Sequence, residues 1–196
     1  MTFCDCTDLT ELGPRLVLAA RHSGPQLDAT TGDIIRPSSF ALAIHEGAHA
    51  VAALRLGIDV VSLTCNGDEC ITRVANWPAW SGLKEKLLFK LAGRVADKQA
   101  LSRSVDDLLA CIAQTRAGRK GGCDWCHAFQ LLLQDEPTAT DRRLIDRFFD
   151  HEIAACNLIC EPSARDAIRR IARVFFAFGH LDASDIRHLY AMEGRA

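Results

Sequence analysis

The segment that most constrains the fold is FALAIHEGAHAVAALRL, residues 40–56. Two serines before it can cap a helix, and Gly57 provides a stop at the other end. We therefore predict one helix across the segment. The side of this helix that carries His45 and His49 is otherwise apolar, so we expect it to be buried. It consists of Ala41, Ala48, Ala52 and Leu56.

The sequence HEGAH at residues 45–49 fits the pattern H-E-x-x-H. Residues four apart in a helix lie one turn above each other, so His45 and His49 can bind one metal ion. Glu46 is offset by about a quarter of a turn, where its carboxylate can reach a metal-bound water. Zinc lowers the pKa of that water to about 7, and a glutamate can accept its proton as it attacks a carbonyl. The pattern predicts zinc chemistry, because a buried imidazole needs a partner.

A catalytic zinc ion usually has three protein ligands and one open position. The third ligand must come from elsewhere in the chain, and spacing rules do not decide which residue it is. The candidates are Glu85, Asp106, Asp107, Asp124 and a cysteine near residue 123.

The rest of the sequence predicts a mainly α (α+β) fold. Two β-branched stretches flank Asn66-Gly67 and predict a small β-hairpin. Residues 1–37 read as an N-terminal extension that is partly loop, and residues 38–196 as a metallopeptidase-like domain with a C-terminal helical bundle. Helices are predicted over residues 9–21, 83–102, 105–115, 124–134, 142–160, 163–178 and 184–192.

The composition of the chain limits which binding partners and which cellular compartment we expect for the protein. The net charge is −2 and does not predict the basic surface that binds nucleic acid, so we expect no nucleic-acid partner. The N-terminus is acidic, and no apolar run is long enough for a signal peptide or a membrane span, so we expect a soluble, cytoplasmic protein without a membrane partner. The nine cysteines are then expected to be reduced.

Several segments in order resemble the peptidase domain of the FtsH family of ATP-dependent zinc proteases. The helix with HEGAH resembles the family's A-x-H-E-A-G-H-A-V-V, with the order of Gly47 and Ala48 reversed. VVSLTCNGDECITRV is similar to the strand pair that follows. AGRVAD, residues 92–97, resembles a reduced G-G-R-x-A-E-E signature, and ARDAIRRIARVFFAFGHLDASDIRHLY resembles the family's last two helices. The resemblance covers residues 38–192.

The resemblance also implies a third zinc ligand. GGCDWCHA, residues 121–128, is the best match to the family's G-A-x-x-D-L-x-x-A, whose aspartate binds zinc. It makes Asp124 the preferred ligand and Asp107 the rival. The implied activity is that of a zinc metalloendopeptidase in which His45, His49 and Asp124 hold one Zn²⁺ and Glu46 is the catalytic base.

The family's ATPase unfolds and feeds protein substrates, but the sequence contains no P-loop. We therefore expect peptides or unfolded protein segments as substrates, unless a separate ATPase motor supplies folded ones. The oligomeric state stays open. Two other functions remain: a catalytically silent, zinc-stabilised protein-interaction module, and hydrolysis of a non-peptide amide by the same chemistry.

Further residues carry secondary expectations. Cys4 and Cys6 in the extension could reach the zinc and block it. The outer strand of the hairpin could pair with an extended substrate. A second, structural zinc site could form from Cys123, Cys126, Cys156 and Cys160. Surface or capping roles are expected for His127, His151, His180 and His188.

Overall fold

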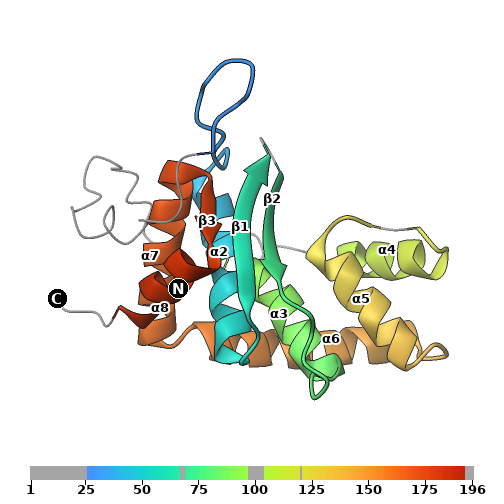
Figure 1. Ribbon diagram of the computed structural model, residues 1–196. Coiled ribbons are helices and arrows are strands. Elements are labelled where there is room, and N and C mark those ends of the chain that lie inside the picture. The colour runs from blue at the N-terminus through green and yellow to red at the C-terminus, as the bar shows by residue number, and fades with distance from the viewer. Residues whose placement is uncertain (1–25, 67–68, 97–103, 120, 193–196) are drawn as a thin grey trace.

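The computed structural model describes residues 26–66, 69–96, 104–119 and 121–192. The predicted mainly helical fold with one small sheet is confirmed (Figure 1). In chain order the elements are α2 (Phe40–Arg55), β1 (Val60–Asn66), β2 (Glu69–Val74), α3 (Leu83–Ala96), α4 (Val105–Arg116), α5 (Asp124–Asp135), α6 (Asp141–Ile159), α7 (Pro162–Phe178), β3 (His180–Asp182) and α8 (Ala183–Ala191).

Helix α2 lies at the centre of the molecule and packs against the sheet, α3 and α7. Ser39 caps its first turn by accepting a hydrogen bond from the N–H of Leu42. Almost every residue from Ala43 to Ala53 is buried, so the middle of α2 has little contact with solvent. Ala41 departs from the prediction and is exposed, because it lies in the first turn before the neighbouring elements cover the helix.

The sheet is antiparallel in the order β2-β1-β3, so β2 lies at one edge of the sheet that the described residues form. The hairpin prediction is confirmed for β1 and β2, although its turn includes residues 67–68, outside the described part. β3 was not predicted. It is only three residues long and follows Gly179 directly, too short a stretch for an alternating pattern to show in the sequence.

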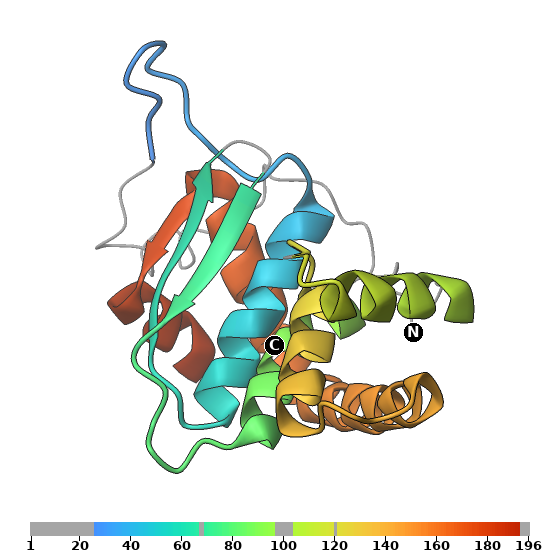
Figure 2. The same ribbon diagram turned by 90° about the vertical axis from the view of Figure 1, so that its right-hand side faces the viewer.

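Two apolar cores lie on either side of α3. The sheet-side core fills the space between α2, the sheet, α7 and α8; among its members are Ala50, Val51, Leu63, Ile168 and Phe175. The α6-side core fills the space between α3, α4, α5 and α6; among its members are Leu91, Ile112, Phe129, Leu144 and Phe148. Figure 2 shows α4, α5 and α6 grouped on one side of α2, and the sheet on the other.

The described part of the N-terminal extension is a loop, as predicted. Leu27 and Ile34 form an isolated antiparallel bridge, and the N–H of Gln26 donates to the carbonyl of Phe178 at the end of α7. The predicted helix over 9–21, and the role suggested for Cys4 and Cys6, lie outside the described residues. In the part of the chain that is described, no helix has both the length and the apolarity needed to cross a bilayer.

The ends of most predicted helices agree with the structure. The helices predicted over 105–115, 124–134, 142–160, 163–178 and 184–192 all occur, with each end within one residue of the prediction. The helix predicted over 83–102 is observed as Leu83–Ala96, and its remaining residues lie beyond the described segment.

Candidate metal centre

Three potential ligand atoms meet between α2 and the first turn of α5. His45 Nε2 lies 2.9 Å and His49 Nε2 lies 3.4 Å from Asp124 Oδ2. The two Nε2 atoms are 3.1 Å apart, with the ring planes at 75° to each other. The structure therefore brings the side chains of His45, His49 and Asp124 to one point, as a shared metal site would require.

The spacing of these atoms fits a tetrahedral zinc ion. With metal–ligand distances of about 2.0–2.1 Å, tetrahedral geometry separates neighbouring ligand atoms by about 3.3 Å. The observed separations of 2.9, 3.1 and 3.4 Å lie close to this value. Two imidazoles and a carboxylate also form a donor set that catalytic zinc commonly uses. The residues present therefore fit the ion that the sequence predicts.

Gly93 on α3 leaves open the space that both imidazoles face. A Cβ atom built on Gly93 would lie 2.6 Å from His45 Nε2 and closer still to His49 Nε2. Non-bonded atoms need about 3.5 Å, so any side chain at position 93 would push the two rings away from their observed positions. The absence of a side chain at position 93 is thus a condition for metal binding between these two rings.

The backbone of α3 orients the ring of His49. His49 Nδ1 lies 2.7 Å from the carbonyl oxygen of Phe89. A carbonyl oxygen only accepts hydrogen bonds, so Nδ1 carries a proton and Nε2 is the ring nitrogen directed toward His45 and Asp124. Metal-ligating histidines are commonly held in this way, with the other ring nitrogen donating to a carbonyl or carboxylate.

The charges at the site are strongly coupled. Burial by itself would raise the pKa of Asp124, but hydrogen bonds from the two imidazoles and their charge hold that pKa well below its usual range. Burial would lower the pKa of His49, but the hydrogen bond and charge of Asp124, with a smaller contribution from Glu46, raise it. Without a metal, the Asp124 carboxylate therefore favours the protonated form of the His49 imidazole, and a bound cation would compete with that proton.

Glu46 lies on α2 next to the two histidines and is held by the sheet. Its side chain is 5% exposed. Thr72 Oγ1, from β2, lies 2.6 Å from Glu46 Oε2 and 3.0 Å from the backbone oxygen of Glu46. The hydroxyl has one proton and donates it to one oxygen at a time. The remaining lone pairs of the Glu46 carboxylate stay available to another proton donor. Thr72 thus fixes Glu46 without using up its capacity as a base.

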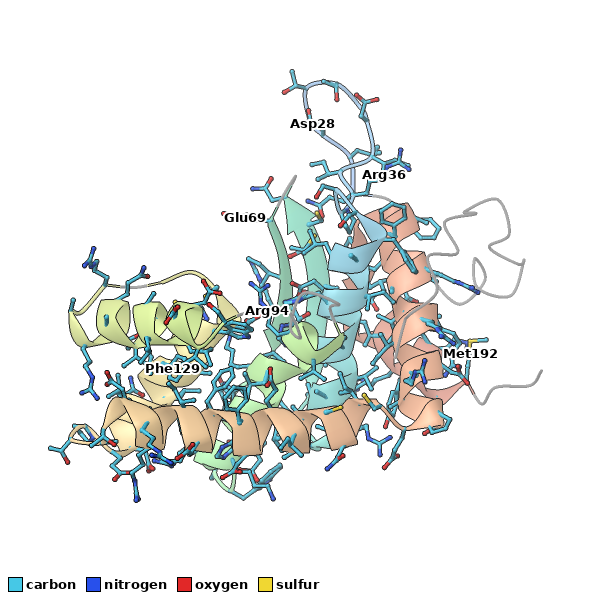
Figure 3. The ribbon with its side chains drawn as sticks, turned by 180° about the vertical axis from the view of Figure 1, so that it is seen from behind. Asp28, Arg36, Glu69, Arg94, Phe129 and Met192 are labelled. Carbon is cyan, nitrogen blue, oxygen red and sulfur yellow. The ribbon has the colours of Figure 1, made fainter. Side chains whose placement is uncertain are left out.

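The ligand atoms open onto a cleft of about 600 Å³. Its lining residues come from α2, β2, α3, α5 and the loop before α5. Glu69 on β2 and Arg94 on α3, both labelled in Figure 3, mark two of its sides. Glu46, His45, His49 and Asp124 all line this cleft, so a molecule bound in it can contact these four side chains together.

Two polar side chains of the cleft were not predicted as site residues. Arg94 Nε is buried without a hydrogen-bond partner and lies 4.0 Å from Asp124 Oδ2. His127 Nδ1 is also buried without such a partner. His127 was expected at the surface or as a cap, but it lines the cleft instead. Its position one turn after Asp124 on α5 is the signal that could have indicated this.

The rival carboxylates have other partners. Asp107 forms a capping box with Ser104 at the start of α4, where its Oδ2 accepts from the N–H of Ser104 at 3.1 Å. Asp106 is exposed on the same helix. Glu85 accepts from the N–H of Gly82 at the start of α3. None of these three belongs to the group of ligand atoms around His45 among the described residues.

The two predicted cysteine pairs do not come together. The Sγ atoms of Cys156 and Cys160 are 3.3 Å apart on α6, and Cys160 packs against the sheet-side core. Cys123 and Cys126 pack against the α6-side core instead. The four-cysteine site is therefore wrong: spacing within each pair does not indicate which face of the fold the pair lies on.

Compared with known proteins, the chain matches no family model and no curated protein. The resemblance to the FtsH peptidase domain stays a prediction from the motifs. The geometry of the site is thus the basis on which a function can be inferred.

Proposed function

We propose that this protein is a zinc-dependent metallopeptidase, a hydrolase that cleaves peptide bonds with a metal-activated water. The observation that carries the proposal is the meeting of His45, His49 and Asp124 beside the carboxylate of Glu46 in one cleft. The FtsH resemblance predicts the same four residues in the same roles. The spacing of the ligand atoms supports zinc as the cofactor, and Gly93 lets the two imidazoles lie close enough together to share it.

Glu46 would move the protons of the reaction. Zinc, when bound, supplies Lewis acidity that lowers the pKa of a water molecule and polarises the scissile carbonyl. Glu46 accepts the proton that the attacking water loses and then delivers it to the leaving amine. Thr72 keeps the carboxylate on the cleft side of α2 through the contact at Oε2. Its burial limits the contact of Glu46 with bulk water.

The sheet offers a binding surface for an extended peptide. β2 is an edge strand of the sheet, and Glu69, Cys70, Ile71 and Thr72 from it line the cleft. An edge strand presents unpaired backbone groups to which a peptide backbone can add as a further strand. In Figure 1 the outer side of β2 faces α5, so a peptide bound there would run past the ligand atoms.

An unsatisfied hydrogen-bond donor in the cleft supports a polar substrate. A buried donor without a hydrogen bond is costly, and Arg94 Nε is such a donor among the described residues. A substrate carbonyl or carboxylate oxygen would satisfy it. The proposed substrates are peptides or unfolded segments, with a separate ATPase motor as the partner required for folded proteins.

The substitution Glu46→Gln tests the proposal. It removes the base but leaves all three ligands, so we expect stoichiometric zinc and at least about 100-fold slower peptide cleavage. Zinc is counted by atomic emission, and cleavage is followed with unfolded casein and a quenched peptide library. Glu152→Gln, on α6 away from the cleft, is the matched control and should cleave at the wild-type rate.

The possible outcomes distinguish the proposed peptidase from the two alternative functions. Cleavage by Glu46→Gln at the wild-type rate would remove Glu46 from the mechanism. A wild-type protein that holds zinc through the three ligands and cleaves neither substrate would contradict the peptidase and favour the zinc-stabilised module. Cleavage of small amides without cleavage of peptides would favour the non-peptide hydrolase.

A further inference from the structure

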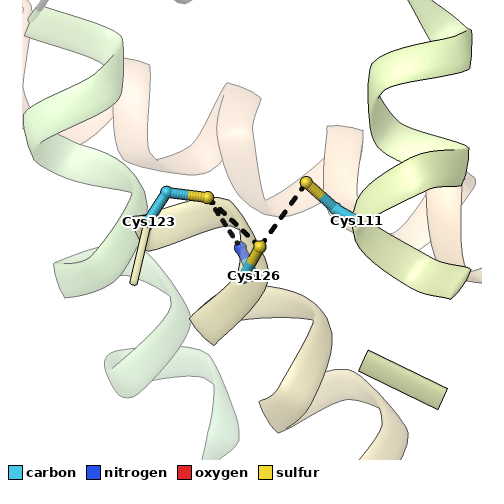
Figure 4. A group of neighbouring side chains, drawn as sticks. All are labelled: Cys111, Cys123 and Cys126. Atoms are coloured by element: carbon cyan, nitrogen blue, oxygen red, sulfur yellow. Dashed lines mark hydrogen bonds between the residues drawn. The ribbon is translucent and has the colours of Figure 1, made fainter. Parts of the chain in front are cut away.

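Three cysteine sulfurs converge beside the start of α5, outside the candidate metal centre (Figure 4). Cys126 Sγ lies 3.2 Å from Cys123 Sγ and 3.6 Å from Cys111 Sγ. All three sulfurs lie within 4.8 Å of one another. Cys111 comes from α4, whereas Cys123 and Cys126 come from the first turn of α5. Two helices therefore present their sulfurs to one point.

The first turn of α5 is capped by a sulfur atom, that of Cys123. Cys123 is the N-cap of α5, and its Sγ accepts from the N–H of Cys126 at 3.4 Å. Serine, threonine, aspartate and asparagine are the usual residues at this position. A backbone N–H that donates to sulfur at a helix N-terminus favours the thiolate, which is the form that binds metals.

Gly121 allows the preceding loop to approach the sulfurs. A Cβ atom on Gly121 would lie 2.6 Å from Cys126 Cβ and closer still to its Sγ, a distance that excludes any side chain. The loop backbone thus passes directly over Cys126. Cys111 is 7% and Cys126 is 3% exposed, whereas Cys123 is only partly buried, so solvent would reach a cation held here from the side of Cys123.

We propose that Cys111, Cys123 and Cys126 form a second metal site that binds Zn²⁺ through three thiolates. Tetrahedral zinc with metal–sulfur distances of about 2.3 Å separates its sulfurs by about 3.8 Å. The observed separations of 3.2 and 3.6 Å require only small shifts to reach this value. Each sulfur loses its proton to solvent on binding, and water completes the coordination.

The second site would stabilise the first. Asp124, a ligand in the candidate metal centre, lies in sequence between Cys123 and Cys126. A metal ion that joined these two cysteines to Cys111 would fix the turn that holds the Asp124 carboxylate and would tie α4 to α5. This inference does not depend on the proposed peptidase activity, because sulfur ligation can be measured whether or not the protein cleaves peptides.

X-ray absorption at the zinc edge of the reduced, full-length wild-type protein tests the proposal directly. We expect sulfur neighbours at about 2.3 Å together with nitrogen and oxygen neighbours, and two zinc ions per chain. A spectrum without sulfur neighbours overturns the proposal. This measurement needs no variant, so it does not depend on whether a substituted protein folds.

Cobalt substitution then assigns the ligands. The His49→Ala variant should lose one metal ion but retain the thiolate-to-cobalt charge-transfer absorption. Cys126→Ser in that background should lose the absorption, while Cys156→Ser, from a pair with nearly the same sulfur separation, should keep it. Charge-transfer absorption that follows Cys156 instead of Cys126 overturns the assignment.

We also expect Cys111→Ser to weaken zinc binding at the histidine site about tenfold, as loss of an orienting contact does.

Discussion

The two sides of the candidate metal centre are built differently. His45, Glu46 and His49 lie on α2, a mostly buried helix that packs largely into the sheet-side core. Asp124 begins another helix, whose inner face packs into the α6-side core through Trp125 and Phe129. Helix α3 contributes residues to both cores and lies between the two sides.

This difference shows which ligand positions depend on one helix alone and which depend on the packing between helices. On the α2 side, the spacing of the ligands follows from helical geometry and cannot change while the helix persists. On the α5 side, the position of Asp124 depends on how α5 packs against α3 and α6. Phe129 stacks on Phe148 of α6 with ring centroids 5.0 Å apart, which anchors α5 at a distance from the ligand itself. A bound ion would therefore link two separately packed parts of the molecule.

The largest effect is expected where α3 meets both imidazoles. Gly93→Ala places a methyl group against both imidazoles and displaces them from Asp124, so we expect zinc binding to fall below detection and cleavage to be lost. Isothermal titration with zinc and circular dichroism measure binding and folding. Gly82→Ala, near the start of the same helix, is the control, since its Cβ meets only the flexible carboxylate of Glu85. Zinc binding by folded Gly93→Ala at wild-type affinity would contradict the assigned metal position.

Removal of the α5 ligand should have the next largest effect. Asp124→Asn replaces a charged ligand by a neutral amide, and we expect zinc affinity to fall at least about 100-fold with the fold retained. Asp107→Asn is the matched substitution at the rival carboxylate, where an asparagine still accepts hydrogen bonds at the helix start. We expect it to keep wild-type zinc affinity. The reverse ranking in a competition assay with a zinc chelator would make Asp107 the ligand.

A smaller effect should follow when the contact that positions Glu46 is removed. Thr72→Val removes the hydroxyl that contacts Glu46, so we expect kcat to fall about tenfold while zinc content stays the same. Thr64→Val, on the neighbouring strand β1, provides the same substitution away from this contact. Equal kcat values for the two variants would show that Thr72 does not position the base.

The pH dependence tests the coupling between the two sides. The raised pKa of His49 means that this group stabilises the metal-free protein at pH values below the ordinary imidazole pKa, and that this contribution is lost as the pH rises through the raised value. The lowered pKa of Asp124 means that its contribution is present above the ordinary aspartate pKa and is lost as the pH falls through the lowered value. The metal-free protein should therefore lose stability as the pH rises through the raised pKa of His49.

Zinc binding should have the opposite pH dependence. The ion replaces the proton on His49, so affinity should increase about tenfold per pH unit while that proton is displaced. Thermal unfolding of chelator-treated and zinc-loaded protein between about pH 5 and 9 measures both effects. Asp124→Asn lacks the ion pair and should show a weaker dependence in the metal-free state. Parallel curves for the metal-free and zinc-loaded wild-type protein would contradict the exchange of proton for metal.

Local signals in the sequence predicted much of this arrangement. Helix periodicity and caps placed α2 and most later helices, because these depend on residues close together in the chain. The pairing of His45 with His49 followed from the same regularity. The choice of Asp124 over Asp107 came from a resemblance to a family motif and not from spacing, because it depends on how α5 packs.

The residues that sequence reasoning missed act through long-range packing. Thr72 reaches Glu46 from another element, and Gly93 matters only because α3 crosses α2 at the two imidazoles. Cys111 joins Cys123 and Cys126 because α4 packs on α5, which no pattern of cysteine spacing reveals. Such contacts become visible when the tertiary structure is known.

The acceptor that holds His49 is a main-chain carbonyl, and this has a consequence for variation at position 89. A carbonyl oxygen has two lone pairs, so it can serve both the helix and the imidazole. Replacement of the phenylalanine side chain leaves the acceptor in place, and only a displacement of α3 itself can remove it. The tautomer of His49 therefore reports on the position of α3, and nitrogen NMR of that ring could follow movements of the helix in solution.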